Sequence, residues 1–192
     1  MIGKGKSISH GVAALEYDLA KEIDGQAAAT EIARHELYGC TGAEMVQEMK
    51  PYHIDFPNVK NNCLRFEVSP SIEESATFTD ADWAELGNDF MQRMGLANHQ
   101  YIIIRHSGTE SKKEQAHLHI LANRVSLSGE LYRDNWIGKK ATEAANAIAK
   151  ERNFVQSQDI GKVNKAEIKE AMDGVLKKMQ GFDFTKFKEG TW

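Results

Sequence analysis

Two histidines separated by one residue, in the stretch AHLHILANRV at residues 116–125, have the types and spacing of metal ligands. Polar and apolar residues alternate here, which is typical of a β-strand. His117, His119 and, further along, Asn123 would therefore share one face of that strand. Such a pair also occurs as ordinary hydrogen-bonded structural histidines. A third imidazole nearby would favour metal binding.

His106 is the candidate for that third imidazole. It ends the β-branched run YIIIRH at residues 101–106, and the polar segment 107–116 that follows has the character of a hairpin loop. The two strands would then be antiparallel neighbours, with His106 close to His117 and His119. Three neutral imidazoles with open coordination positions suit a catalytic divalent ion better than a closed structural zinc site.

Composition sets broad limits on the protein. The 192 residues are 41% hydrophobic and 27% charged, which predicts one globular domain, or a domain with an appendage. No stretch approaches the roughly 20 apolar residues of a membrane helix, and the N-terminus lacks the apolar core of a signal peptide. The two cysteines without C-x-x-C spacing fit a reducing cytoplasm. A net charge of −4 argues against a protein that coats nucleic acid, but leaves room for a local basic groove.

Hydrophobic periodicity outlines the elements that must position these histidines. CLRFEVSP at residues 63–70 alternates cleanly, so it is predicted to be a strand with Arg65 and Glu67 on its polar face. A short strand is expected within residues 1–9, and helices are expected at residues 11–21, 26–36, 42–50, 80–94 and 139–152. The predicted fold is α+β: a central antiparallel sheet of about five strands, helices mainly on one face, and the hairpin of residues 100–125 at its centre.

Arranged in this way, the chain resembles the relaxase or mobilisation nuclease family (HUH type) of plasmids and conjugative elements, especially forms found on Bacteroidetes elements. His106 followed by HLHILANR at residues 117–124 is similar to that family's metal motif. The resemblance covers nearly the whole chain. It continues, in the expected order, through KSISHG at residues 6–11, a helix bearing Tyr17, FEVSPSIE at 66–73 and AANAIAKE at 144–151.

The resemblance implies a DNA relaxase. Such an enzyme nicks one strand at an origin of transfer through a tyrosine and keeps a 5′-phosphotyrosyl intermediate. Tyr17 matches the family position of that nucleophile; the alternative is that it only packs beneath the sheet. His106, His117 and His119 would hold a divalent metal ion, Mg²⁺ or Mn²⁺, with Zn²⁺ as an alternative. Implied partners are single-stranded DNA at the origin of transfer, accessory mobilisation proteins and a coupling protein, in the bacterial cytoplasm.

The acid that supports the metal site is less evident. Many family members carry an aspartate shortly after the first histidine, where this chain has Ser107, Gly108 and Thr109. Glu67, on the neighbouring strand, and Glu114, in the hairpin loop, are the candidates, although a plain surface acid is the favoured interpretation of Glu114.

Further candidates would contact DNA or support the motif. Arg65, Arg105 and Arg124 could pair with phosphates, because a guanidinium matches phosphate bidentately, although arginines at strand ends are often surface residues. Asn123 could contact DNA or stabilise the histidine motif.

Two domains are expected. Residues 1–155 would be the relaxase catalytic domain, and residues 156–192 a lysine-rich helical extension, cut short from a longer protein. Two rival functions remain: a hydrolase that acts through a metal-bound water and needs no tyrosine, and a non-enzymatic DNA-binding module in which the histidines are structural.

Overall fold

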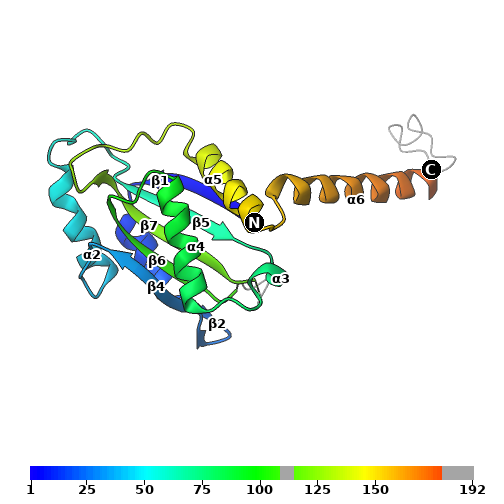
Figure 1. Ribbon diagram of the computed structural model, residues 1–192, viewed down its shortest axis with the longest axis horizontal. Coiled ribbons are helices and arrows are strands. Elements are labelled where there is room, and N and C mark those ends of the chain that lie inside the picture. The colour runs from blue at the N-terminus through cyan, green and yellow to red at the C-terminus, as the bar shows by residue number, and fades with distance from the viewer. Residues whose placement is uncertain (109–114, 179–192) are drawn as a thin grey trace, which may run out of the picture. The chain divides into compact units, whose positions relative to one another are not determined.

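The structure of the protein is a computed structural model, and it describes residues 1–108 and 115–178 (Figure 1). Strands and helices are interspersed along the chain. In order, the elements are β1 (Ile2–Ile8), α1 (Gly11–Leu19), β2 (Glu22–Ile23), β3 (Gln26–Ala27), β4 (Ala29–His35), α2 (Gly42–Met49), a 3₁₀ turn (Lys50–His53), β5 (Cys63–Ser69), α3 (Ile72–Ser75), α4 (Asp80–Arg93), β6 (His99–His106), β7 (His117–Ser126), α5 (Ile137–Glu151) and α6 (Ser157–Lys178).

Five strands form one sheet in the order β1-β5-β7-β6-β4, and every neighbouring pair is antiparallel. The β6–β7 hairpin supplies the central strand, β7, and its neighbour. The predicted α+β fold with a five-stranded antiparallel sheet around this hairpin is therefore confirmed.

The two longest helices of this sheet domain, α4 and α5, cover one face of the sheet (Figure 1). The inward side chains of β5 are those expected from the alternation, and they are buried against aromatic and aliphatic residues of α4. Helix α5 lies unusually close to β1: a Cβ built on Gly3 would lie 2.4 Å from the carbonyl oxygen of Ala141. Glycine on β1 is what permits this approach.

The shorter helices α1 and α2 pack on the opposite face. Leu15 of α1 and Met45 and Met49 of α2 are buried against Ile102 and Ile104 of β6. The rest of this face carries polar side chains of β1, β5 and β7. This partial cover leaves the end of the hairpin, where the histidines lie, next to an open part of the sheet.

One predicted helix is wrong. Residues 26–36 form strands β3 and β4 instead, and β4 is an edge strand paired with β6. Alanine content favoured a helix, but pairing with β6 overrides that weak preference. Asp24 and Gly25 both have positive φ angles, 52° and 73°, and they make the tight turn between β2 and β3.

The chain divides into two compact units, Met1–Gln156 and Ser157–Trp192. The first contains the whole sheet. The described part of the second is α6, whose Ile168, Met172 and Val175 are exposed. In the part of the chain that the structure describes, no helix is both long and apolar enough to cross a membrane.

Candidate metal centre and its surroundings

His106, His117 and His119 meet at the end of the hairpin. Their ring centroids are 4.4–5.3 Å apart, and each ring offers one nitrogen within 4.8 Å of the other two. The β6–β7 register places His106 directly opposite His117. Because β7 alternates, His119 lies on the same face two residues further along. The sequence prediction that these three side chains converge is confirmed.

The hydrogen bonds define which nitrogen of each ring is available. Nε2–H of His106 donates to the backbone carbonyl of Asp18, at 2.8 Å, and Nδ1–H of His117 donates to the carbonyl of Gln115, at 3.1 Å. In the neutral rings this leaves the lone pairs on Nδ1 of His106 and on Nε2 of His117. Arg65 donates to Nδ1 of His119, so the proton of that neutral ring is on Nε2. Nε2 of His119 lies 3.1 Å from Nε2 of His117, so this N–H donates to the lone pair of His117.

Burial favours the uncharged form of His106 and His119. Desolvation is the largest of the effects that lower the pKa of His119 to about 2, and neighbouring His106 and Arg65 contribute to the same shift. Desolvation also lowers the pKa of His106. Rings that stay neutral at physiological pH keep lone pairs for an ion, so no proton has to be displaced from a charged imidazolium.

The donor set fits a divalent metal ion. Imidazole nitrogens bind such ions at about 2.0–2.2 Å, which places tetrahedrally arranged ligand nitrogens about 3.5 Å apart. The Nε2 atoms of His117 and His119 are already 3.1 Å apart. Three ligands from one protein leave coordination positions open, as in catalytic rather than structural sites.

Asp18 is the residue of this site that the sequence reasoning missed. Its carboxylate is buried and holds Arg65 of β5 with two hydrogen bonds, of 2.5 and 3.1 Å, and it lies 3.8 Å from Nδ1 of His119. The sequence pattern could have identified it. Asp18 lies at helical spacing from Ala14 and Leu15, on the buried side of α1, and a buried acid needs a positively charged or hydrogen-bonding partner.

Tyr17 lies beside Asp18 on α1 and is 60% exposed, so it does not pack beneath the sheet. Nζ of Lys21, one turn further along the chain, lies 5.8 Å from the centre of its ring. The tyrosine therefore lies next to the residue that contacts both His106 and His119, with its phenol accessible to a large substrate.

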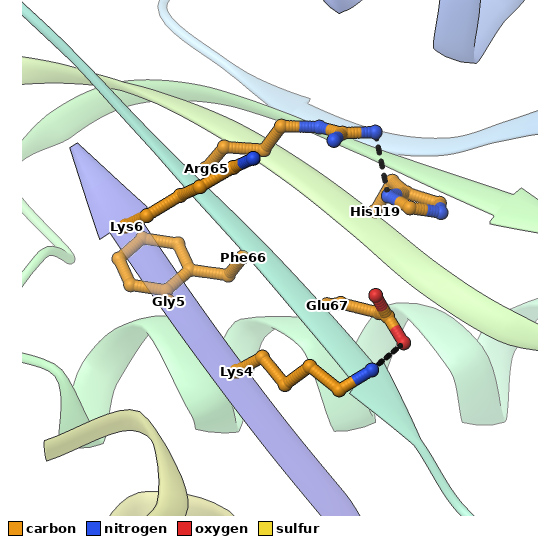
Figure 2. Close-up of a pocket in the computed structure, with 7 residues that line it drawn as sticks. All are labelled: Lys4, Gly5, Lys6, Arg65, Phe66, Glu67 and His119. Atoms are coloured by element: carbon orange, nitrogen blue, oxygen red, sulfur yellow. Dashed lines mark hydrogen bonds and ion pairs between the residues drawn. The ribbon is translucent and has the colours of Figure 1, made fainter. Parts of the chain in front are cut away.

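Glu67 lies on β5 directly opposite His119 of β7. Its carboxylate forms an ion pair with Lys4 of β1, at 2.9 Å (Figure 2). Between Asp18 and Glu67, it is Asp18 whose carboxylate lies within 4 Å of a nitrogen of His119. Glu114, the other acid considered from the sequence, lies outside the described residues.

The chain was compared with protein-family models. Residues 17–154 match the model described as relaxase, MobA/VirD2-like, nuclease domain. The chain belongs to this relaxase family. The match covers well over half of the chain, including all three histidines, Tyr17 and Asp18. A comparison with curated proteins gives no match.

Two of the arginines considered as phosphate ligands lie away from the histidine cluster of this relaxase domain. Arg105 points to the opposite face of the sheet from His106, where it binds Asp80 at 2.5 Å. Arg124 binds Asp134 at 2.6 Å and thereby holds the loop before α5. Arg65 is the one that contacts the cluster, with Nη2 3.2 Å from Nδ1 of His119.

Asn123 is completely buried in the relaxase domain. Its Oδ1 accepts from Nε2 of His53, at 2.7 Å, and from the backbone N–H of Val125; its Nδ2 donates to Gln100 and to the carbonyl of Met49. These bonds tie β7 to β6 and to the end of α2. They give Asn123 a supporting position within the fold.

Proposed function

We propose that this relaxase domain nicks one strand of DNA at an origin of transfer, with Tyr17 as the nucleophile and His106, His117 and His119 as the ligands of a divalent metal ion. The observation that carries the proposal is the position of α1. The backbone carbonyl of Asp18 binds His106, at 2.8 Å, and its carboxylate lies beside His119. Tyr17, whose phenol is accessible, directly precedes Asp18 on this helix, and this adjacency supports its role as the nucleophile.

The reaction is an exchange of phosphodiesters. The phenol oxygen of Tyr17 attacks the scissile phosphorus, the bond from phosphorus to the 3′ oxygen breaks, and that oxygen takes up a proton. The products are a 5′-phosphotyrosyl link and a free 3′-hydroxyl, so the phosphodiester can be re-formed by the reverse reaction. A phenol must lose its proton to attack, and the ammonium group of Lys21 lies 5.8 Å from the centre of the Tyr17 ring.

The three histidines and the residues around them prepare the site for negative charge. A bound Mg²⁺ or Mn²⁺, or Zn²⁺, would act as a Lewis acid toward the phosphate oxygens. Arg65 lies 3.2 Å from His119 and brings a guanidinium to the same face. Asp18 holds that guanidinium in place, and Glu67 lies opposite His119 as a second acid of the site.

The test compares wild type with Tyr17→Phe, which removes only the phenol oxygen. Each protein is incubated with Mn²⁺ and a pool of single-stranded oligonucleotides with randomised sequence, labelled at the 3′ end. The 5′-phosphotyrosyl fragment keeps that label. We expect label on denatured wild-type protein and none on Tyr17→Phe. Sequencing of the attached DNA would give the nick site.

Tyr38→Phe is the matched control, because Tyr38 is also exposed and is not on α1. It should form the adduct as wild type does. An adduct that persists in Tyr17→Phe would assign the nucleophile to another tyrosine. Cleaved DNA without any adduct in the wild type would instead identify a hydrolase.

A further inference from the structure

The ammonium group of Lys21 lies near both Tyr17 and the histidine cluster. Lys21 follows the C-terminal end of α1 and is partly buried, and its Nζ lies 5.8 Å from the centre of the Tyr17 ring. Its charge also reaches the cluster: burial is the largest cause of the lowered pKa of His106, and the positive charge of Lys21 is one of the smaller causes. One cation therefore lies close to the phenol and to the first of the three histidines.

Backbone hydrogen bonds tie Lys21 to the end of the strand that carries His106. The carbonyl of Lys21 accepts from the N–H of Ala28, at 2.8 Å, and the carbonyl of Ala28 accepts from the N–H of Ser107, at 2.9 Å. Ser107 directly follows His106, which lies opposite Ala29 in the β4–β6 register. The position of Lys21 beside the cluster is thus fixed by strand pairing as well as by the packing of α1.

Lys21 differs from the other cation beside the cluster in having no acidic partner in the described part of the chain. Arg65 is held by the carboxylate of Asp18 through hydrogen bonds of 2.5 and 3.1 Å. The ammonium group of Lys21 forms no ion pair or hydrogen bond with residues 1–108 or 115–178, and its contact there is the face of the Tyr17 ring. An ammonium group has three N–H donors, so donors remain for a negatively charged ligand.

A structural role explains only part of this arrangement. A cation after the C-terminal end of a helix interacts favourably with the helix dipole, and a cation over a tyrosine ring is attracted by the ring face. Neither interaction requires the charge to lie near His106. A divalent ion bound by the histidines would repel the ammonium group of Lys21, and the two cations are compatible when an anion lies between them.

We propose that Lys21 is a further catalytic residue of strand nicking, whose ammonium group donates to a non-bridging oxygen of the scissile phosphate while Tyr17 attacks the phosphorus. The bond from the Tyr17 oxygen to phosphorus forms, the bond from phosphorus to the 3′ oxygen breaks, and Lys21 keeps its proton throughout. A donor that is already in place where charge develops stabilises the transition state more than the ground state. This assignment rests on the proposed function.

Single-turnover adduct formation tests the assignment. Wild type, Lys21→Ala and Lys21→Arg, each in excess over a 3′-labelled oligonucleotide that carries the nick site, are mixed with it at saturating Mn²⁺, and the protein concentration is varied. We expect Lys21→Ala to lower the rate constant at saturation by about 100- to 1,000-fold, the loss typical of removing one donor to a transition-state charge. The half-saturating concentration should change far less. Lys21→Arg should restore part of the rate, because a guanidinium can donate to the same oxygen.

Controls separate catalysis from structure. Lys21→Ala should unfold at the same temperature as wild type, since no ion pair of the described fold is lost. It should bind Mn²⁺ as tightly as wild type or more tightly, because a positive charge near the ion is removed. Lys150→Ala removes an exposed lysine in the last turn of α5 and should leave the rate constant unchanged.

Three results would overturn the inference while leaving the proposed function standing. One is adduct formation by Lys21→Ala at the wild-type rate. Another is a loss confined to the half-saturating concentration, which would make Lys21 a contact for DNA binding alone. The third is a slow Lys21→Ala that also unfolds at a lower temperature or binds Mn²⁺ more weakly, which would assign Lys21 a structural role. The absence of any adduct in the wild type would instead contradict the proposed function, and the inference with it.

Discussion

The guanidinium of Arg65 joins His119 to Asp18: its Nη2 lies 3.2 Å from Nδ1 of the imidazole and 2.5 Å from the carboxylate. Arg65 can only donate, so Nδ1 accepts and the proton of the neutral ring is on Nε2. An ion at Nε2 requires the opposite tautomer, with the proton on Nδ1. Asp18 Oδ1, at 3.8 Å, is then the acceptor that can hold it.

This relationship predicts that Asp18, rather than Glu67, is the acid that supports metal binding. Asp18→Asn removes the carboxylate that would accept from Nδ1–H of His119 in the metal-bound tautomer, so Mn²⁺ affinity measured by calorimetry should fall by about 10- to 100-fold. Glu67→Gln should change it far less, since that carboxylate is engaged with Lys4. Thermal unfolding of each variant serves as the control, because Asp18 also holds Arg65. A larger loss of Mn²⁺ affinity in Glu67→Gln than in Asp18→Asn would identify Glu67 as the acid that supports metal binding.

Loss of one imidazole should abolish the metal site. His119→Ala leaves two ligands and removes the ring that lies beside Arg65 and the Asp18 carboxylate, so saturable Mn²⁺ binding and strand nicking should both disappear. The fold should persist, because the apolar cores on either face of the sheet do not include this side chain.

His10→Ala is the matched control, being an exposed histidine just before α1. It should bind Mn²⁺ as the wild type does. Wild-type affinity in His119→Ala would mean that the histidines are structural.

Local patterns sufficed for the hairpin and its histidines. The β-branched run before His106, the polar loop and the alternation around His117 together specify two strands and their register, and the register brings the rings together. The helix expected at residues 26–36 failed because alanine propensity is weak against pairing with β6, although the Asp24–Gly25 turn signalled a hairpin.

The contacts of Asp18 depend on packing between distant segments. Arg65 and Asp18 are 47 residues apart in the sequence, and the packing of α1 on the sheet determines that they pair. That docking follows from tertiary packing, which single-sequence periodicity does not describe. The same holds for Arg105 and Arg124, whose partners Asp80 and Asp134 place them outside the histidine cluster.

The metal-free protein should lose stability as the pH falls below about 6.5, the ordinary pKa of histidine. Burial lowers the pKa of His99, His106 and His119, so these rings stay neutral in the folded state while the unfolded chain takes up protons. Where the unfolded state binds more protons, the free energy of unfolding decreases with decreasing pH, by at most about 1.4 kcal/mol per pH unit for each such group.

His99 tests this without touching the metal cluster. It is buried and donates from Nδ1 to the carbonyl of Asn123, at 2.9 Å. His99→Asn keeps a donor there but cannot titrate. Urea unfolding from pH 7.5 to 5.5 should show a shallower decline for this variant, by about 1 kcal/mol per pH unit or less. A slope identical to that of wild type would contradict the inference that His99 takes up a proton on unfolding.

Asn123→Ala should separate a supporting role from a role in DNA binding. The substitution removes four hydrogen bonds inside the fold and leaves His53, Gln100 and the carbonyl of Met49 without their buried partner. The free energy of unfolding measured in urea should fall by about 2–3 kcal/mol. Asn98→Ala, at an exposed asparagine with one hydrogen bond to Ser128, should cost less than about 0.5 kcal/mol. At a temperature where both variants are folded, each should bind Mn²⁺ and oligo(dT) as wild type does, because Asn123 has no exposed surface through which to contact DNA. If Asn123→Ala kept its stability but bound DNA more weakly, Asn123 would be a DNA contact rather than a supporting residue.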